Sequence, residues 1–404
     1  MFLIIFQSCI ASAQVRNPLH PAAGLEITTA EQWAEQRPAL LEYFSREMYG
    51  RSPDRPKQMH WEVFDRDPNA LNGKATRLQI AVFPGGGPEP RIDLLIYVPN
   101  AVEGPVPVFL GLNFWGNHAI HSDAGIRLTE AWLESNGGSY VDLSGVRDNR
   151  ATEATRGINA SQWPVEEILS RGYALATVYR EEVASDREPY FATGVHPLFP
   201  ELQKGEDNFG TIAAWAWFLS RALDVIASEE SLDAKRVAVF GWSRLGKAAL
   251  WAGATDERIA LTIAIQSGAG GAKLFHRGVG EDIRRLNTVF PHWFARNFRA
   301  YIDKDISLQF DQHFVLSLIA PRPLYISSAE EDTHADPEGE FLAAKAAEPV
   351  YRLLGAEGLP AEEWPPVGKP VHGGIGYHIR PGDHHVTSYD WQQFLAFADQ
   401  HLKR

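Results

Sequence analysis

Residues 236–250 read RVAVFGWSRLGKAAL, and this stretch decides the fold class. A short β-rich run from Val237 to Phe240 passes through Gly241-Trp-Ser243 into an alanine-rich run typical of a helix. A strand that enters a helix through Gly-x-Ser holds the serine in a strained turn and lifts its hydroxyl above the sheet. The backbone N–H groups and dipole at the start of that helix favour a developing negative charge. Ser243 is therefore a candidate nucleophile, although a plain strand-to-helix turn is the commoner reason for such a pattern.

The same alternation of strand and helix extends along the chain on both sides of this stretch. An early pair of antiparallel strands is separated by Gly85-Gly-Gly-Pro, and an amphipathic first helix is capped near Thr28. The predicted strands are 78–83, 92–98, 106–112, 173–179, 237–240, 259–265 and 324–327, and further helices are predicted at 211–226 and from about Ser388. The sequence thus predicts an α/β fold with a mostly parallel central sheet, helices on both faces and antiparallel N-terminal strands.

Two polar stretches, 142–161 and 278–306, are too long for ordinary connections. We expect both to be insertions that build the functional site. Neither a repeat nor a Pro/Gly/Ser linker divides the chain, so residues 14–404 are predicted to form a single catalytic domain.

The first residues, MFLIIFQSCIASAQ, combine an apolar run with the small-x-small pattern Ala11-Ser-Ala13. This predicts a secretory signal peptide over residues 1–13 and export to the periplasm or the medium. Cys9, the single cysteine, lies in this leader, so the mature chain can form no disulfide. A lipid anchor attached at Cys9 is the alternative to a cleaved signal peptide. No later segment approaches the ~20 apolar residues of a membrane span.

Composition excludes several classes of partner. The 404 residues are 45% hydrophobic and 22% charged, which is ordinary for a globular protein, and the formal charge is −13. Nucleic acids and anionic membranes bind clustered Lys and Arg, so neither is expected as a partner. The fourteen histidines form no H-E-x-x-H motif, and we expect neither metal nor other cofactor and a monomeric protein.

A serine nucleophile needs a histidine base and a carboxylate that orients the histidine. His384 and His385 stand just before the last predicted helix, and either one alone reads as a solvated loop residue. Residues 324–332 form a strand that ends in three carboxylates, each of which by itself reads as a loop charge. Asp332 is favoured as the acid because α/β sites assemble at the carboxyl ends of strands.

Gly241-Trp-Ser-Arg-Leu-Gly-Lys247 resembles the serine motif of the glucuronoyl esterases, carbohydrate esterase family fifteen. Stretches similar to its bacterial members follow in order: GLNFWGNH at 111–118, QSGAGG at 266–271, FPHWF at 290–294, FDQH at 310–313, APRP at 320–323 and GDHHVTSYDW at 382–391. The resemblance spans roughly residues 30 to 404. It implies an α/β-hydrolase fold and hydrolysis of the ester between lignin alcohols and (4-O-methyl-)glucuronate side groups of glucuronoxylan.

On this resemblance Ser243 is the nucleophile of a Ser-His-Asp triad that forms an acyl-enzyme. His384 fits the Gly-x-His spacing of the family base better than His385, and Asp332 matches the acid of some bacterial relatives. Arg244 would stabilise the oxyanion, and Lys247 would bind sugar hydroxyls.

The chain departs from the family pattern at several positions. Gln266 stands where many relatives carry a glutamate, and an amide cannot neutralise an imidazolium. His334 stands where relatives have a tryptophan, which puts the ligand preference in question. Gly246 comes one residue later than in Gly-x-Ser-x-Gly. Glu281 resembles a residue that binds sugar hydroxyls, with an exposed loop charge as an equal alternative.

Two other functions are compatible with the sequence. One is a serine esterase with another acyl preference, such as an acetyl or feruloyl xylan esterase. The other is a carbohydrate-binding relative that has lost catalysis, an idea motivated by Gln266 and His334 and opposed by the intact triad residues.

Overall fold

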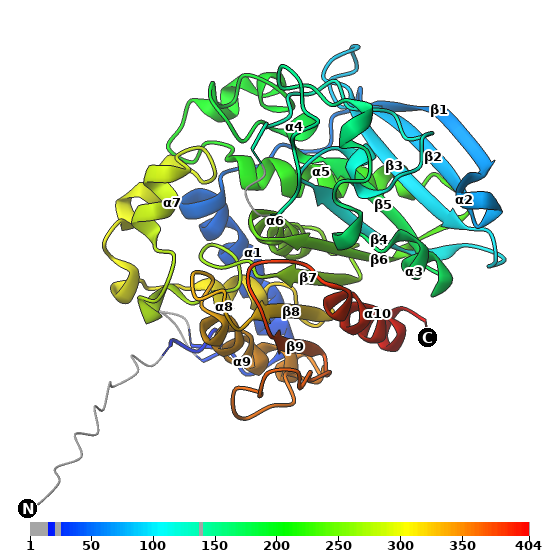
Figure 1. Ribbon diagram of the computed structural model, residues 1–404. Coiled ribbons are helices and arrows are strands. Elements are labelled where there is room, and N and C mark those ends of the chain that lie inside the picture. Colours follow the sequence, from blue (N-terminus) through cyan, green and yellow to red (C-terminus); the bar gives the residue numbers. More distant parts are fainter. Residues whose placement is uncertain (1–14, 21–25, 137–139, 404) are drawn as a thin grey trace, which may run out of the picture.

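The computed structural model describes residues 15–20, 26–136 and 140–403, and a nine-stranded sheet lies at its centre (Figure 1). The strands are β1 His60–Asn69, β2 Ala75–Phe83, β3 Ile92–Pro99, β4 Val106–Asn113, β5 Ala174–Tyr179, β6 Leu232–Trp242, β7 Leu261–Ile265, β8 Leu324–Ala329 and β9 Ile375–Arg380. They lie in the order β1-β2-β3-β5-β4-β6-β7-β8-β9. β4 to β9 pair in parallel, whereas β1, β2 and β3 are antiparallel and β3 joins β5 antiparallel. The predicted mostly parallel sheet with antiparallel N-terminal strands is confirmed.

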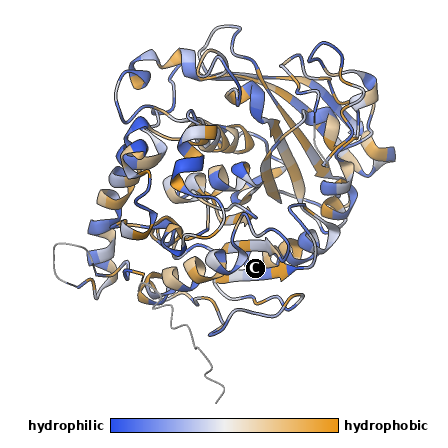
Figure 2. Cartoon of the chain, turned by 60° about the vertical axis from the view of Figure 1, so that its left-hand side comes forward, coloured by the Kyte–Doolittle hydropathy of each residue, from blue (hydrophilic) through white to orange (hydrophobic). Residues whose placement is uncertain are grey.

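Helices cover both faces of the sheet. They are α1 Ala30–Phe44, α2 Ala70–Gly73, α3 Val165–Ser170, α4 Arg180–Val183, α5 Thr211–Ile226, α6 Arg244–Thr255, α7 Ile283–Val289, α8 Gln312–Ser317, α9 Pro337–Leu353 and α10 Ser388–Leu402. Strand side chains alternate between the faces, so Leu110 joins one buried core with α5, α6 and α9. The adjacent Phe109 joins a second core with α3 and α10. Figure 2 shows the apolar residues along the interior strands and a mixture of polar and apolar residues around the covering helices.

Local capping explains where the first and last helices begin. Thr29 caps α1 in a reciprocal capping box with Gln32. Thr387 caps α10 in the same way with Asp390, so the last helix begins at Ser388 as predicted. This cap also ends the loop that carries His384 and therefore limits where that loop can lie.

The edge strand β1 and the helix α9 are among the elements that the predicted set does not contain. β1 pairs only with β2 at the sheet edge, and its residues are exposed or half-buried, so it has no clear hydrophobic alternation. α9 has an alanine-rich buried stripe and contains Pro349, which together weaken its sequence signal. The predicted signal peptide at 1–13, with Cys9, lies outside the described residues. Within the described ranges, no helix is long and apolar enough to cross a membrane.

Candidate active site

A cavity of about 440 Å³ opens above the carboxyl ends of the strands. Its floor is built by residues that directly follow strands: Phe114 after β4, Arg180 after β5, Ser243 after β6 and Gln266 after β7. Parallel strands end at the same edge of a sheet, so side chains far apart in sequence meet there. The remaining described lining residues are Trp115, Glu134, Asn136, Tyr140, Trp242, Arg244, Lys247, Ser267, Gly268, Glu281, Arg285, Phe290, Trp293, Asp332, His334, Ala335 and His384.

Only one of the two predicted insertions lines this cavity. The stretch 278–306 supplies Glu281, Arg285, Phe290 and Trp293. Among the residues that the structure describes, 142–161 contributes none of the lining. The segment just before it contributes Glu134, Asn136 and Tyr140 instead. The lining residues of this region therefore precede the predicted stretch.

Ser243 sits in a sharp turn between β6 and α6, with φ 58° and ψ −129°. Its backbone N–H donates to the Ile265 carbonyl of β7 at 2.8 Å, which ties the turn to the neighbouring strand. Glycine is required around it, because a Cβ on Gly241 would lie 2.1 Å from the Leu245 carbonyl oxygen and one on Gly246 would lie 2.9 Å from the Gly241 oxygen. The strained serine turn predicted from the sequence is present, and the later position of Gly246 fits it.

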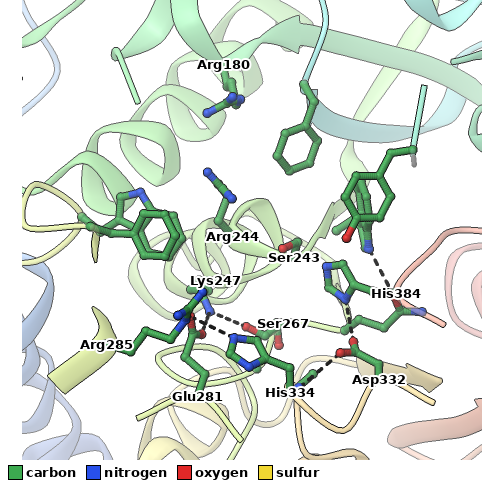
Figure 3. A pocket seen from close by; sticks show the side chains of 18 of the residues that line it. Arg180, Ser243, Arg244, Lys247, Ser267, Glu281, Arg285, Asp332, His334 and His384 are labelled. Atoms are coloured by element: carbon green, nitrogen blue, oxygen red, sulfur yellow. Dashed lines mark hydrogen bonds and ion pairs between the residues drawn. The ribbon is translucent and has the colours of Figure 1, made fainter. Parts of the chain in front are cut away.

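His384 and Asp332 lie together beside this serine. The His384 Nδ1 is 2.5 Å from the Asp332 Oδ2, and Figure 3 shows the ring between the Ser243 hydroxyl and the Asp332 carboxylate. The Asp332 side chain is 5% exposed, whereas Glu330 and Glu331 are exposed. His385 does not contact Asp332: its Nδ1 is 3.7 Å from the largely exposed carboxylate of Asp383, and its ring is 5.3 Å from that of Tyr140. The geometry brings together Ser243, His384 and Asp332 and leaves His385 aside.

Gln266 contacts the histidine loop through its side-chain amide. The Gln266 Nε2 donates to the His385 carbonyl at 2.8 Å, and its Oε1 accepts from the Trp242 indole at 3.2 Å. The Arg380 guanidinium donates to the same His385 carbonyl and, at 2.8 Å, to Asp390. A glutamate could not donate to a carbonyl, so the amide at 266 has a role that a carboxylate would not fill.

Arg244 begins α6 and lies on the other side of Ser243 from His384 in Figure 3. Its Nη1 donates to the Asp186 Oδ2 at 2.5 Å. Its guanidinium carbon is 4.8 Å from the Trp293 ring centre and 5.2 Å from that of Phe290, so the cation is stacked against aromatic surface. The orientation of this cation is therefore restricted on several sides.

Lys247 and Glu281 form a buried pair at the polar end of the cavity (Figure 3). The Lys247 ammonium donates to the carbonyls of Ser267 at 2.7 Å and Ala269 at 2.6 Å and to the Glu281 Oε2 at 3.1 Å. These three acceptors match its three protons. Burial would raise the pKa of Glu281, but Lys247 and His334 outweigh it and lower the pKa to about 2. Glu281 is thus a buried, ionised acceptor rather than an exposed loop charge.

His334 lies at the mouth beside the same carboxylate. Its Nε2 is 3.6 Å from the Glu281 Oε1, and its side chain is 56% exposed. Arg285 is 4.0 Å from the same Oε1 and is half exposed. The Glu281 Oε1 therefore has only loose contacts and remains accessible to a hydroxyl donor from the cavity.

An aromatic wall faces this polar end. The rings of Tyr140 and Phe114 approach Trp242 edge-on, with centroids 5.1 and 5.3 Å away. The Trp242 ring is 5.0 Å from that of His384. The cavity thus has a polar end and an aromatic end, and Ser243 lies between them.

A buried carboxyl group supports the floor from behind. Glu340 of α9 accepts from the Gly268 N–H at 2.9 Å and from the hydroxyls of Ser267 at 3.2 Å and Ser328 at 2.7 Å. Burial raises its pKa to about 7. Glu340 thus holds the turn at Ser267 and Gly268, whose neighbouring carbonyls accept hydrogen bonds from Lys247.

Sequence reasoning missed several residues of this site. Arg180 could have been found, because it follows a predicted strand directly, as candidate site residues do. Asp186 and Glu340 have no such local signal, since each reaches the site only through folding. In the described part of the chain, no group of three or more His, Cys, Asp or Glu side chains is arranged to hold a metal ion.

Comparison with known sequences gives matches over nearly the whole chain. A family model described as fungal glucuronyl esterase matches residues 151–355. Carbohydrate esterase MZ0003, from an unknown prokaryotic organism, is 44% identical over 395 residues, which cover 96% of this chain and 89% of that protein.

Solved structures agree with these matches. A glucuronoyl esterase from Solibacter usitatus is 42% identical, with a TM-score of 0.89 and coverage of 96% of this chain and 97% of that one. A structure described as a promiscuous CE15 esterase from a marine bacterial metagenome is 44% identical, with a TM-score of 0.89 and 96% of each chain covered. The expected α/β-hydrolase architecture is confirmed.

Proposed function

The chain belongs to the glucuronoyl esterase family and is a carboxylic ester hydrolase that acts on glucuronate esters; from this premise we propose that its substrate is the ester between (4-O-methyl-)D-glucuronate side groups of glucuronoxylan and lignin alcohols. We further propose a Ser243-His384-Asp332 triad. The observation that carries the proposal is the 2.5 Å contact of His384 Nδ1 with Asp332, with the ring beside Ser243.

Catalysis proceeds through an acyl-enzyme. His384 Nε2 takes the Ser243 proton as the Ser243 Oγ attacks the uronoyl carbonyl carbon. When the tetrahedral intermediate collapses, the ester C–O bond breaks and His384 gives its proton to the departing alcohol. A water molecule then loses a proton to His384 and attacks the acyl carbon, which releases glucuronate and returns the proton to Ser243. Asp332 holds the imidazole and stabilises its positive charge.

Arg244 and the backbone N–H groups at the start of α6 stabilise the oxyanion. Helix α6 begins directly after Ser243, so its dipole and free N–H groups face the position where negative charge develops. Arg244 adds a full positive charge on the side of Ser243 away from His384.

The two ends of the cavity suggest how the substrate lies. The uronate ring binds at the polar end, where the Glu281 Oε1 accepts from a sugar hydroxyl and Lys247 holds Glu281 ionised. All three Lys247 N–H groups already donate to protein acceptors, so a hydrogen bond from Lys247 to the sugar must be shared with one of those acceptors. The leaving alcohol binds against Tyr140 and Trp242, whose rings suit an aromatic lignin unit.

A second candidate is a broader serine carboxylesterase that also accepts acetyl or feruloyl esters. His334 favours this candidate, because it covers less of the sugar surface than tryptophan would and leaves the acyl end more open. The description of one similar structure as promiscuous points in the same direction. A binding protein without catalysis is disfavoured by the Ser243, His384 and Asp332 arrangement.

Hydrolysis of benzyl D-glucuronate and p-nitrophenyl acetate by the purified protein tests the proposal. We expect strong uronate cleavage that disappears in Ser243→Ala, with Ser170→Ala, an exposed serine of α3, as the matched control. Cleavage of acetate alone would establish the broader esterase. Absence of activity on both esters would favour the alternative of a carbohydrate-binding protein without catalysis.

Export is also part of the proposal. Cleavage after residue 13 would give a mature protein that begins at Gln14. Expression in a bacterial host, fractionation and N-terminal sequencing of the exported protein test this. Retention of the first thirteen residues in the cytoplasmic fraction would contradict it, and light scattering of the mature protein tests the expected monomer.

A further inference from the structure

A buried carboxylate, Asp186, lies behind Arg244 in the wall of the cavity. Its side chain is 4% exposed. The Oδ2 accepts from Arg244 Nη1 at 2.5 Å and from Arg180 Nη1, and the Oδ1 accepts from His292 Nε2 at 2.9 Å and from Trp293 Nε1 at 2.7 Å. Four donors from three parts of the chain thus meet on one carboxylate.

Further contacts hold this assembly in place. The turn before Asp186 is held because the Trp215 indole donates to the carbonyls of Arg180 and Ala184, each at 3.1 Å. The His292 ring stacks on Tyr190 with centroids 4.0 Å apart and an interplanar angle of 7°. The carboxylate is therefore fixed by its surroundings before it orients anything else.

We propose that Asp186 is a positioning residue of the reaction. It fixes the Arg244 guanidinium so that guanidinium N–H groups not bonded to Asp186 face the carbonyl oxygen of the substrate ester above Ser243. This inference rests on the proposed function, in which Arg244 stabilises the oxyanion. Trp293 serves twice, because its indole N–H anchors Asp186 and its ring stacks under Arg244.

The hydrogen bonds of Arg244 support this assignment. Its Nη1 donates to Asp186, while its side chain lines the cavity and is 27% exposed, so part of the guanidinium remains within reach of a ligand. A guanidinium with donors in a fixed fork suits an oxyanion only if its plane is held in place.

The sharing of Asp186 preserves the charge of Arg244. In a one-to-one pair the carboxylate would neutralise the guanidinium that the oxyanion needs. Here the Oδ2 is shared with Arg180, and the Oδ1 is turned toward His292 and Trp293. Burial would raise the pKa of Asp186, but Arg244, Arg180 and His292 outweigh it and keep the pKa far below its ordinary value. The carboxylate therefore remains charged wherever the enzyme works.

A double-mutant cycle tests the assignment. Rates on benzyl D-glucuronate are measured for the wild type, Asp186→Asn, Arg244→Ala and the double variant. We expect Asp186→Asn to lower kcat by roughly 100-fold, the loss typical of one oxyanion donor, with KM changed less than about threefold. In the Arg244→Ala background the same change is expected to cost less than about threefold, because its partner is already gone.

The controls separate positioning from folding. Asp123→Asn removes another shielded carboxylate that pairs with an arginine, Arg77, outside the cavity, and is expected to leave kcat within about twofold of wild type. Trp293→Phe keeps an aromatic ring under Arg244 and removes only the donor to Asp186, so we expect a smaller loss, about tenfold, that also vanishes without Arg244. It replaces Asp186→Asn if that variant does not fold.

Each outcome has a distinct meaning. Equal losses in both backgrounds would overturn the proposal and make Asp186 a structural residue. Full kcat in Asp186→Asn would overturn it as well. Full activity in Arg244→Ala would instead contradict the role of Arg244 in the proposed function, and activity in Ser243→Ala would contradict the triad.

Discussion

Replacing Asp332 by asparagine removes one charge from the proposed triad and almost nothing else. The carboxylate is 5% exposed and lies 2.5 Å from the His384 Nδ1, so water screens the pair poorly. With charge centres about 4 Å apart and an effective dielectric constant of about 20, the attraction to a protonated imidazole is about 4 kcal/mol. At 1.36 kcal/mol per factor of ten, this loss alone slows the reaction about 1,000-fold.

The asparagine amide adds a second cost. Its NH₂ group can donate to Nδ1 and hold the imidazole in the wrong tautomer, so the total loss approaches the ~10⁴-fold seen for the same change in serine-protease triads. We therefore expect kcat on benzyl D-glucuronate to fall by a factor of about 10³ to 10⁴, with little change in KM.

The measurement needs a matched control and a check of folding. Glu331→Gln neutralises an exposed carboxylate next to Asp332 and is expected to keep kcat within about twofold. Thermal unfolding of both variants shows whether the fold is retained. A loss below tenfold in a folded Asp332→Asn protein would refute the reasoning and remove Asp332 from the triad.

Three further changes test other parts of the site. Gln266→Glu replaces the donor to the His385 carbonyl by a carboxylate, and we expect kcat to fall about tenfold; a gain in kcat would contradict this and point to a second acid at 266. His334→Trp covers roughly 40 Å² more apolar sugar surface, worth about 1 kcal/mol, so KM for benzyl D-glucuronate is expected to fall about fivefold at unchanged kcat; an unchanged KM would place the sugar elsewhere. The raised pKa of Glu340, about 7 against an ordinary 4.5, means that between these pH values the folded state keeps a proton that the unfolded state has lost. Stability should therefore fall as pH rises through this window, by up to about 3 kcal/mol, and urea unfolding at pH 5 and pH 8 should show a smaller fall in Glu340→Gln; equal falls in both proteins would refute this.

Much of the fold could be predicted because its signals are local. The central strands are continuous apolar runs, and most of the principal helices show a 3.6-residue apolar stripe or a cap such as Thr387. β1 lacked this signal, since an exposed edge strand needs no buried face. The limits of the cavity-lining segments were also misjudged, because a loop's length does not say which of its residues face inward.

By itself, the sequence determined the turn that carries Ser243. A Cβ on Gly241 or Gly246 would clash with backbone atoms a few residues away. The constraint is therefore local, and the stretch 236–250 is enough to reveal it. The position of residues 330–332 at the edge of the sheet that carries Ser243 was also predictable, since the ends of parallel strands meet at one edge of a sheet.

Only the tertiary structure decided the rest. His384 and His385 follow the same strand, and the path of the loop, held at Gln266, determines that the first faces Asp332. Asp186 meets Arg244 and Trp293 across 58 and 107 residues of chain. Such contacts carry no sequence period, because they arise only when separate loops are brought to the same edge of the sheet.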